Sequence, residues 1–226
     1  MKNYAIILAS GSGKRFNSDL PKQFVKLNGK TILEYSIEAF ENCELINDII
    51  VVIHPQYKNY ACKIIKNNGF KKVSNIINGG VERKDSSYIG VNAINDNNAN
   101  VLIHDCARPF ISDEIITNCI KALDDYNAVA VAIPSSDTII SVENNFISDI
   151  PDRKSLMRIQ TPQCFRLDLI KKAHELSEND SNFTDDCGLV LRHNLAKIHI
   201  IIGSEKNIKI TNPEDIVFAE YVLNQV

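Results

Sequence analysis

The sequence predicts an α/β fold in which helices cover both faces of a mostly parallel sheet. Runs rich in Ile and Val alternate with segments of helical period, and most of these runs lack the polar alternation of a half-exposed strand. Such alternation is typical of parallel sheets, because the crossover helices pack on the two faces. A chain of 226 residues suits one domain, so we expect a single domain over residues 1–226.

The first part of the chain carries its expected elements in regular order. Strands are expected at residues 4–9, 48–53, 73–77, 100–103 and 128–133. Helices are expected at residues 31–40, 56–68, 83–93 and 112–124. The last helix has a clear N-cap signal, because Ser112 precedes two acidic residues and is expected to cap the first turn. The expected architecture is therefore Rossmann-like.

The pattern changes after Pro134. Residues 138–142 and 145–150 are short extended runs around an Asn-rich turn, which predicts a β-hairpin. Such a hairpin either protrudes as an arm toward another subunit or packs at the edge of its own domain, and composition alone makes the second at least as plausible. Beyond it we expect helices at 166–176 and 185–193, strands at 197–202 and 207–211, and a closing helix from Pro213.

Composition narrows the functional classes. A net charge of −3 argues against a general nucleic-acid binder, because such proteins carry excess Lys and Arg. The six cysteines contain no C-x-x-C pair, so we expect free thiols in a reduced compartment. The sequence shows no signal-peptide pattern and no apolar run near the ~18 residues of a membrane span. We therefore expect a cytoplasmic protein that binds neither nucleic acid nor membrane.

A glycine-rich turn follows the first strand. Residues 9–15 read Ala-Ser-Gly-Ser-Gly-Lys-Arg, and small residues let backbone N–H groups cradle a phosphate at the carboxyl end of a strand. The spacing of Gly11 and Gly13 excludes a P-loop, and Phe16 occupies the third glycine position of a dinucleotide fingerprint. A nucleotidyltransferase loop remains, with Arg15 after the turn and Lys22 downstream in Pro-Lys-Gln. These residues predict a triphosphate site.

Further motifs carry a family resemblance. They are Gly79-Gly80-x-x-Arg83-x-x-Ser86, His104-Asp105-Cys106-Ala107-Arg108-Pro109, Asp137-Thr138, Asp152-Arg153 ahead of Thr161-Pro162-Gln163, Thr184-Asp185-Asp186, and Asn207-Ile208-Lys209-Ile210-Thr211 with Pro213-Glu214-Asp215. In this order and spacing the chain resembles the 2-C-methyl-D-erythritol 4-phosphate cytidylyltransferases from residue 4 to about residue 220. The related ribitol 5-phosphate cytidylyltransferases share most of these motifs.

The resemblance implies a nucleotidyltransferase domain that transfers CMP from CTP to a small polyol phosphate, with Mg²⁺ as cofactor and pyrophosphate as leaving group. It also implies a homodimer formed through an arm at about residues 136–156. The preferred acceptor is 2-C-methyl-D-erythritol 4-phosphate, for isoprenoid precursor synthesis. Ribitol 5-phosphate is the alternative acceptor. A catalytically silent nucleotide-binding regulator is the alternative of another class, against which the retained charged residues argue.

The resemblance also implies residue roles. The catalytic residues would be Arg15, Lys22 and Lys209. The nucleotide-binding residues would be Ala9, Ser10, Gly11, Ser12, Gly13, Gly80, Arg83, Ser86 and Asp105. The hard carboxylate of Asp105 would also hold Mg²⁺. The substrate-binding residues would be Arg108, Thr138, Arg153 and Thr161, with the arm residues reaching the neighbouring subunit's site.

We assign no catalytic role to four of the histidines or to Cys106. The histidines lack metal-ligand spacing and are expected to be structural or solvated: His54, His174, His193 and His199. Cys106 has no base beside it that would make it a nucleophile.

Two residues depart from the family pattern. Ser10 stands where the family usually has Ala or Gly, and Ser would be costly there if the position required a positive φ. Cys106 stands where the family usually has Ala.

Overall fold

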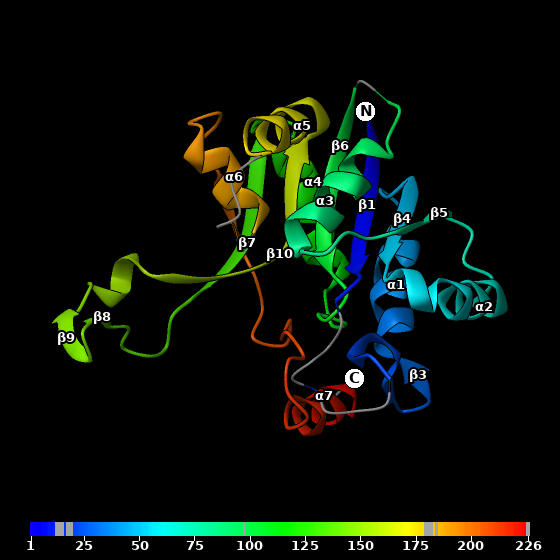
Figure 1. Ribbon diagram of the computed structural model, residues 1–226, viewed down its shortest axis with the longest axis horizontal. Coiled ribbons are helices and arrows are strands. Elements are labelled where there is room, and N and C mark those ends of the chain that lie inside the picture. Colours follow the sequence, from blue (N-terminus) through cyan, green and yellow to red (C-terminus); the bar gives the residue numbers. More distant parts are fainter. Residues whose placement is uncertain (12–15, 17–19, 97, 179–182, 184, 225–226) are drawn as a thin grey trace.

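A seven-stranded sheet forms the centre of the molecule, as a computed structural model shows (Figure 1). The structure describes residues 1–11, 16, 20–96, 98–178, 183 and 185–224. The strands are β1 (Lys2–Ala9), β4 (Asp48–Ile53), β5 (Val73–Asn78), β6 (Ala99–Asp105), β7 (Ala128–Pro134), β10 (Met157–Arg166) and β11 (His199–Ile202). Their order is β11-β7-β10-β6-β1-β4-β5, and all run parallel except β10, which is antiparallel to both neighbours.

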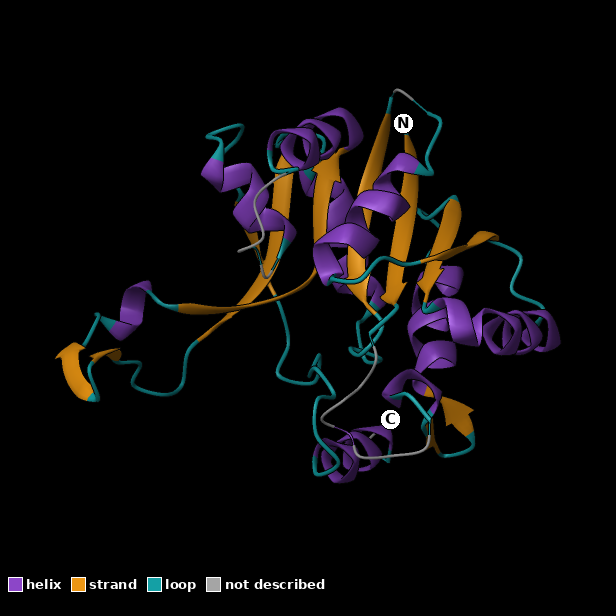
Figure 2. Cartoon of the chain, in the orientation of Figure 1, coloured by secondary structure: helices purple, strands orange, loops and turns teal. Residues whose placement is uncertain are grey.

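Helices cover both faces of this sheet, as Figure 2 shows. They are α1 (Ile32–Asn42), α2 (Lys58–Asn68), α3 (Arg83–Asn92), α4 (Asp113–Ala122), α5 (Leu167–Leu176), α6 (Asp186–Arg192) and α7 (Asp215–Leu223). Residues of α1, α2, α4 and α7 belong to one buried apolar cluster, and residues of α3, α5 and α6 to the other. Alternate residues of each central strand enter opposite clusters, Ile7 one and Ile6 the other, as the two-residue strand period requires. The predicted fold class is confirmed.

Short elements complete the chain. The strands β2 (Lys26–Leu27) and β3 (Lys30–Thr31) form a small antiparallel pair ahead of α1. Thr31 caps α1 in a capping box with Glu34, which explains why the helix begins there. In the described part of the chain, single-turn 3₁₀ helices lie at Lys22–Phe24, Pro55–Tyr57 and Arg153–Ser155.

The structure corrects the strands expected from the sequence in two places, where one strand was missed and another was wrongly expected. Strand β10 was not expected, because Pro162 and several polar residues interrupt its apolar pattern. The strand accommodates this proline at an irregularity, since its register against β7 shifts between Ile159 and Gln163. Conversely, residues 207–211 were expected to be a strand but form an irregular segment, held to the domain by the hydrogen bond from Ile210 N to Ala107 O.

The predicted hairpin protrudes from the domain instead of packing at its edge. Residues between β7 and β10 extend away from the sheet and end in the antiparallel pair β8 (Ser141–Glu143) and β9 (Phe146–Asp149) (Figure 1). Its apolar side chains are exposed, with Phe146 at 77 % and Ile147 at 60 %. We call residues 135–156 the arm.

Within the described part of the chain, no helix combines the length and the apolar character needed to cross a bilayer.

Candidate active site

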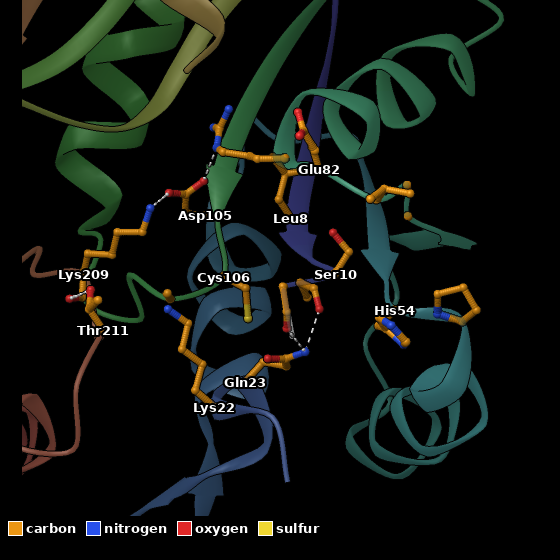
Figure 3. A pocket seen from close by; sticks show the side chains of 18 residues that line it. Leu8, Ser10, Lys22, Gln23, His54, Glu82, Asp105, Cys106, Lys209 and Thr211 are labelled. Atoms are coloured by element: carbon orange, nitrogen blue, oxygen red, sulfur yellow. Dashed lines mark hydrogen bonds and ion pairs between the residues drawn. The ribbon is translucent and has the colours of Figure 1, made fainter. Parts of the chain in front are cut away.

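A pocket of about 790 Å³ opens at the carboxyl ends of four adjacent strands, β1, β4, β5 and β6 (Figure 3). This is the edge at which an open α/β sheet binds its ligand. The pocket brings together eight of the predicted site residues: Ala9, Ser10, Gly11, Lys22, Gly80, Arg83, Asp105 and Lys209. It has the size of a small-molecule site.

An ion-pair cluster forms one wall of this pocket. Asp105, the last residue of β6, accepts a hydrogen bond from Arg83 Nε at 2.9 Å through Oδ1 and one from Lys209 Nζ at 2.7 Å through Oδ2. Burial opposes ionisation of Asp105, but the two cations hold the pKa of its carboxyl well below the usual range. Asp105 is therefore a carboxylate at any physiological pH.

Lys22 faces the pocket beside this cluster (Figure 3). Its Nζ donates to the carbonyl oxygen of Ile210 at 2.8 Å. The neighbouring side chain of Gln23 supports the first strand's loop, because its Nε2 donates to the carbonyls of Ala9 at 2.8 Å and Gly11 at 3.2 Å. The Pro-Lys-Gln segment thus joins the turn after β1 to the C-terminal segment that carries Lys209.

The opposite end of the pocket is built from backbone and small polar groups. Ser86 is buried, and its Oγ lies 2.7 Å from Ser10 Oγ and accepts from Gly80 N at 3.2 Å. Gly79 lies against the same pair, since a Cβ there would be 2.4 Å from Ser10 Cβ. Ser10 is not among the described residues with positive φ, so the expected backbone cost of Ser at this position does not arise.

Thr161 lies behind Asp105 and does not line the pocket. Its Oγ1 accepts from Asp105 N at 3.1 Å and lies 3.1 Å from His104 Nδ1, while His104 Nε2 lies 3.0 Å from Arg108 O. Burial lowers the pKa of His104 to about 4, so the imidazole is neutral. The simplest assignment has Nε2–H donating to the Arg108 carbonyl and the Thr161 hydroxyl donating to Nδ1. This chain of hydrogen bonds fixes the backbone that presents Asp105.

Three predicted substrate residues lie away from the pocket. The guanidinium of Arg108 donates to Asn207 O at 2.8 Å and to Ile159 O at 3.4 Å. Thr138 and Arg153 are exposed on the arm, where Arg153 Nη1 donates to Ser136 O at 3.2 Å. A single chain therefore does not bring the arm residues to its own pocket.

The predictions for Ser12, Gly13 and Arg15 lie outside the described residues, as does Thr184 of the Thr-Asp-Asp motif.

His54 and Asp186 lie in or next to the site, although no role there was predicted for them from the sequence. His54 lines the pocket beyond Ser10, and its Nδ1 accepts from Gln56 N at 3.3 Å (Figure 3). Its position directly after a predicted strand was the available signal. Asp186 is buried and accepts from Arg83 Nη1 at 2.7 Å, although 103 residues separate the two. Nothing local in the sequence indicates that pairing.

Comparison with known proteins places the chain in a family. A family model described as 2-C-methyl-D-erythritol 4-phosphate cytidylyltransferase matches residues 4–225. Proteins of that name from Clostridium botulinum and Thermobifida fusca are both 40 % identical to this chain, over 100 % and 97 % of it and 99 % and 92 % of their own lengths.

Solved structures agree with the sequence relatives. The 4-diphosphocytidyl-2C-methyl-D-erythritol synthase of Anaerococcus prevotii superposes with a TM-score of 0.87 at 30 % identity, covering 99 % of this chain and 96 % of that one. The Francisella tularensis 2-C-methyl-D-erythritol 4-phosphate cytidylyltransferase gives a TM-score of 0.82 at 30 % identity, covering 98 % and 99 %. The chain therefore belongs to the 2-C-methyl-D-erythritol 4-phosphate cytidylyltransferase family.

Proposed function

We propose that this protein transfers CMP from CTP to 2-C-methyl-D-erythritol 4-phosphate and releases pyrophosphate. The observation that carries the proposal is the joint placement of Lys22, Arg83, Lys209 and Asp105 around one pocket at the carboxyl ends of the strands. Three cations in a pocket of this size suit a ligand with several phosphates. Membership of the family supplies the identity of nucleotide and acceptor.

The reaction is an in-line displacement at the α-phosphorus of CTP. A phosphate oxygen of the acceptor forms the new P–O bond, and the bond from the α-phosphorus to the bridging oxygen breaks, so that its electron pair leaves with pyrophosphate. The acceptor phosphate is largely dianionic near neutral pH, its second pKa being about 6, so no general base is required. Positioning and charge stabilisation supply the catalysis.

The cations have separate places in this scheme. Lys22 and Lys209 bind phosphate oxygens and stabilise charge on the α-phosphate and the leaving group. The same role is proposed for Arg15, and phosphate contacts for Ser12 and Gly13, all three of which lie outside the described residues. Lys22 and Lys209 have the reach for this, because their ammonium groups already lie at the pocket wall. Arg83 Nη2 is buried and has no hydrogen-bond partner among the described residues, so it is available as a further donor.

The small-residue end of the pocket takes the cytosine base. Ser10 and Gly11 leave room for a flat group, and Ser86 fixes Gly80 so that its backbone can read the base edge. Fixed polar groups discriminate between bases because the wrong base leaves one of them unpaired.

Magnesium is proposed as cofactor, with Asp105 as its protein ligand. Among the described residues no group of three or more His, Cys, Asp or Glu could hold a metal. One hard carboxylate at the edge of a phosphate pocket nevertheless suits Mg²⁺, which commonly binds through one or two carboxylates and substrate phosphates. The ion would neutralise phosphate charge when bound, and Lys209 would then turn from Asp105 to the phosphates.

The acceptor site is proposed to be shared between subunits. The arm presents exposed apolar side chains that a second copy would bury, and it carries Thr138 and Arg153 away from the chain's own pocket. In a homodimer, Arg153 would clamp the acceptor phosphate of the neighbour, since a guanidinium binds phosphate with two parallel hydrogen bonds. Arg108 and Thr161 would complete that end of the site.

The deciding assay is pyrophosphate release with CTP and Mg²⁺, offering 2-C-methyl-D-erythritol 4-phosphate and ribitol 5-phosphate in parallel. A clear preference for the first acceptor is expected. A preference for ribitol 5-phosphate would instead assign the ribitol 5-phosphate cytidylyltransferase reaction to the protein. Stabilisation by CTP and Mg²⁺ without product from either acceptor would instead indicate a nucleotide-binding regulator.

The shared site has its own test. Lys22→Ala and Arg153→Ala protomers are each expected to be inactive, and mixing them should restore part of the activity through hybrid dimers with one intact site. No recovery, when subunit exchange is demonstrated independently, would refute the shared site.

A cytoplasmic location is also proposed. All six cysteines are free, and five of them are buried, which suits a reducing compartment. Cell fractionation with an antibody to the protein tests this.

A further inference from the structure

Arg83 joins a carboxylate of the pocket to one that lies outside it. Its Nε donates to Asp105 at 2.9 Å, while its Nη1 donates to Asp186 at 2.7 Å. Asp186 does not line the pocket, and its side chain is 1 % exposed. The guanidinium is thus held between two carboxylates, with Nη2 left without a partner among the described residues.

Both the side chain and the backbone of Asp186 are held by hydrogen bonds. Its Oδ1 accepts a short hydrogen bond from the Ser87 hydroxyl, and its backbone N donates to Gln163 Oε1 at 2.9 Å. His174 Nε2 lies 3.7 Å from the same carboxylate, but burial lowers the pKa of His174, so this ring stays neutral. Arg83 is therefore the cation that compensates the buried charge of Asp186.

One strand sets the positions of both carboxylates. Thr161 in β10 binds the backbone of Asp105, and Gln163, two residues further on, binds the first turn of α6, where Asp186 lies. Gln163 also donates to Asp185, which caps that turn. The two carboxylates that hold Arg83 are thereby positioned by the same strand.

The geometry points to Asp186 as a positioning residue that acts on the nucleotide site through Arg83. While Asp186 holds Nη1, Arg83 meets Asp105 through one N–H group only. Without this anchor on Nη1, the guanidinium would be free to turn so that Nη2, which has no partner among the described residues, joins Nε in the usual two parallel bonds with Asp105. Both carboxylate oxygens would then be engaged, in competition with Lys209 and with a divalent cation. This inference rests on the proposed use of the pocket for CTP and Mg²⁺.

The test compares Asp186→Asn with a matched control, Ser87→Ala. The control removes the other hydrogen bond of the same carboxylate but keeps the Arg83 ion pair. Asp186→Asn should raise the calorimetric Kd for CTP and the half-saturating Mg²⁺ concentration by about tenfold or more, as expected when a buried charge partner is lost. Ser87→Ala should change both by less than about threefold despite a lower Tm. Asp186→Glu should restore both values to within about threefold of the parent.

A second pair of variants tests the inference if the Asp186→Asn protein does not fold. If Asp186 acts only through Arg83, then Arg83→Gln and the double variant Arg83→Gln/Asp186→Asn should bind CTP equally, because the second change then has nothing left to act on. A further loss in the double variant would overturn the inference. So would a folded Asp186→Asn protein with unchanged CTP and Mg²⁺ binding. Because CTP binding is measured directly, failure of the proposed reaction with every acceptor would be a separate result.

Discussion

Replacing Gly79 by Ala tests the close packing at the base end of the pocket. A Cβ at position 79 would lie 2.4 Å from Ser10 Cβ, 2.9 Å from Ser10 Oγ and 2.9 Å from Ser86 Oγ. Carbon atoms pack at roughly 3.5–4.0 Å, so Ser10 would have to move by more than about 1 Å. Gly79 itself is held, because its N donates to Ile53 O at 2.8 Å at the end of β4.

The displacement therefore falls on the loop after β1. Overpacking of this kind costs about 1–3 kcal/mol, and we expect Gly79→Ala to lower the free energy of unfolding by about 2 kcal/mol. Moving Ser10 also disturbs its 2.7 Å contact with Ser86, and so the hydroxyl that holds Gly80 N. CTP affinity should fall together with stability.

Ser10→Gly supplies the decisive control because it removes two of the three atoms that the methyl group added at position 79 would strike, including the nearest one. Alone it loses a hydrogen bond worth about 1 kcal/mol and adds chain entropy. The double variant Ser10→Gly/Gly79→Ala should be more stable than the sum of the two single changes predicts. The coupling free energy in a double-mutant cycle should be at least about 1 kcal/mol. Urea unfolding of the four proteins measures the cycle. Strictly additive effects, or a Gly79→Ala protein as stable as the parent, would refute the packing argument.

Three further predictions concern Asp105 and its neighbours. Asp105→Asn should abolish the Mg²⁺ dependence of CTP binding, as calorimetry would show, and unchanged dependence would remove Asp105 as the ligand. His104 has a folded-state pKa of about 4 against an ordinary 6.5, so the unfolded chain binds the proton more readily and stability is lost as pH falls from 6.5 toward 4. Between pH 7 and pH 5 the free energy of unfolding should drop by about 2 kcal/mol on this account. Urea titrations should show a shallower drop in His104→Gln, and identical slopes would contradict the assignment. Burial raises the pKa of Cys106 to about 12, so its thiol should resist alkylation in the folded protein, and Cys106→Ala should keep its pyrophosphate-release rate.

The regular part of the fold could be predicted from the sequence because its signals are local. The strand at 48–53 has the same bounds in the structure, since a run of Ile and Val buried on both faces has no competing pattern. The antiparallel β10 could not be predicted, because its proline and polar residues are stable in a strand only at the register shift against β7. The strand expected at 207–211 was wrong for the converse reason, since an apolar alternation does not by itself supply a partner, and none of the described strands pairs with that segment.

The sequence by itself determined the α/β class, the family and eight of the 18 residues that line the pocket, because these depend on hydrophobic period and on short motifs at the ends of strands. Only the tertiary structure decided which charges meet. Asp105 lies 104 residues from Lys209 and Arg83 lies 103 residues from Asp186, yet each pair lies within hydrogen-bonding distance. Pairings over such separations are set by strand order and helix packing, and no local pattern encodes them. No local pattern indicates either that the arm carries Arg153 away from the pocket of its own chain.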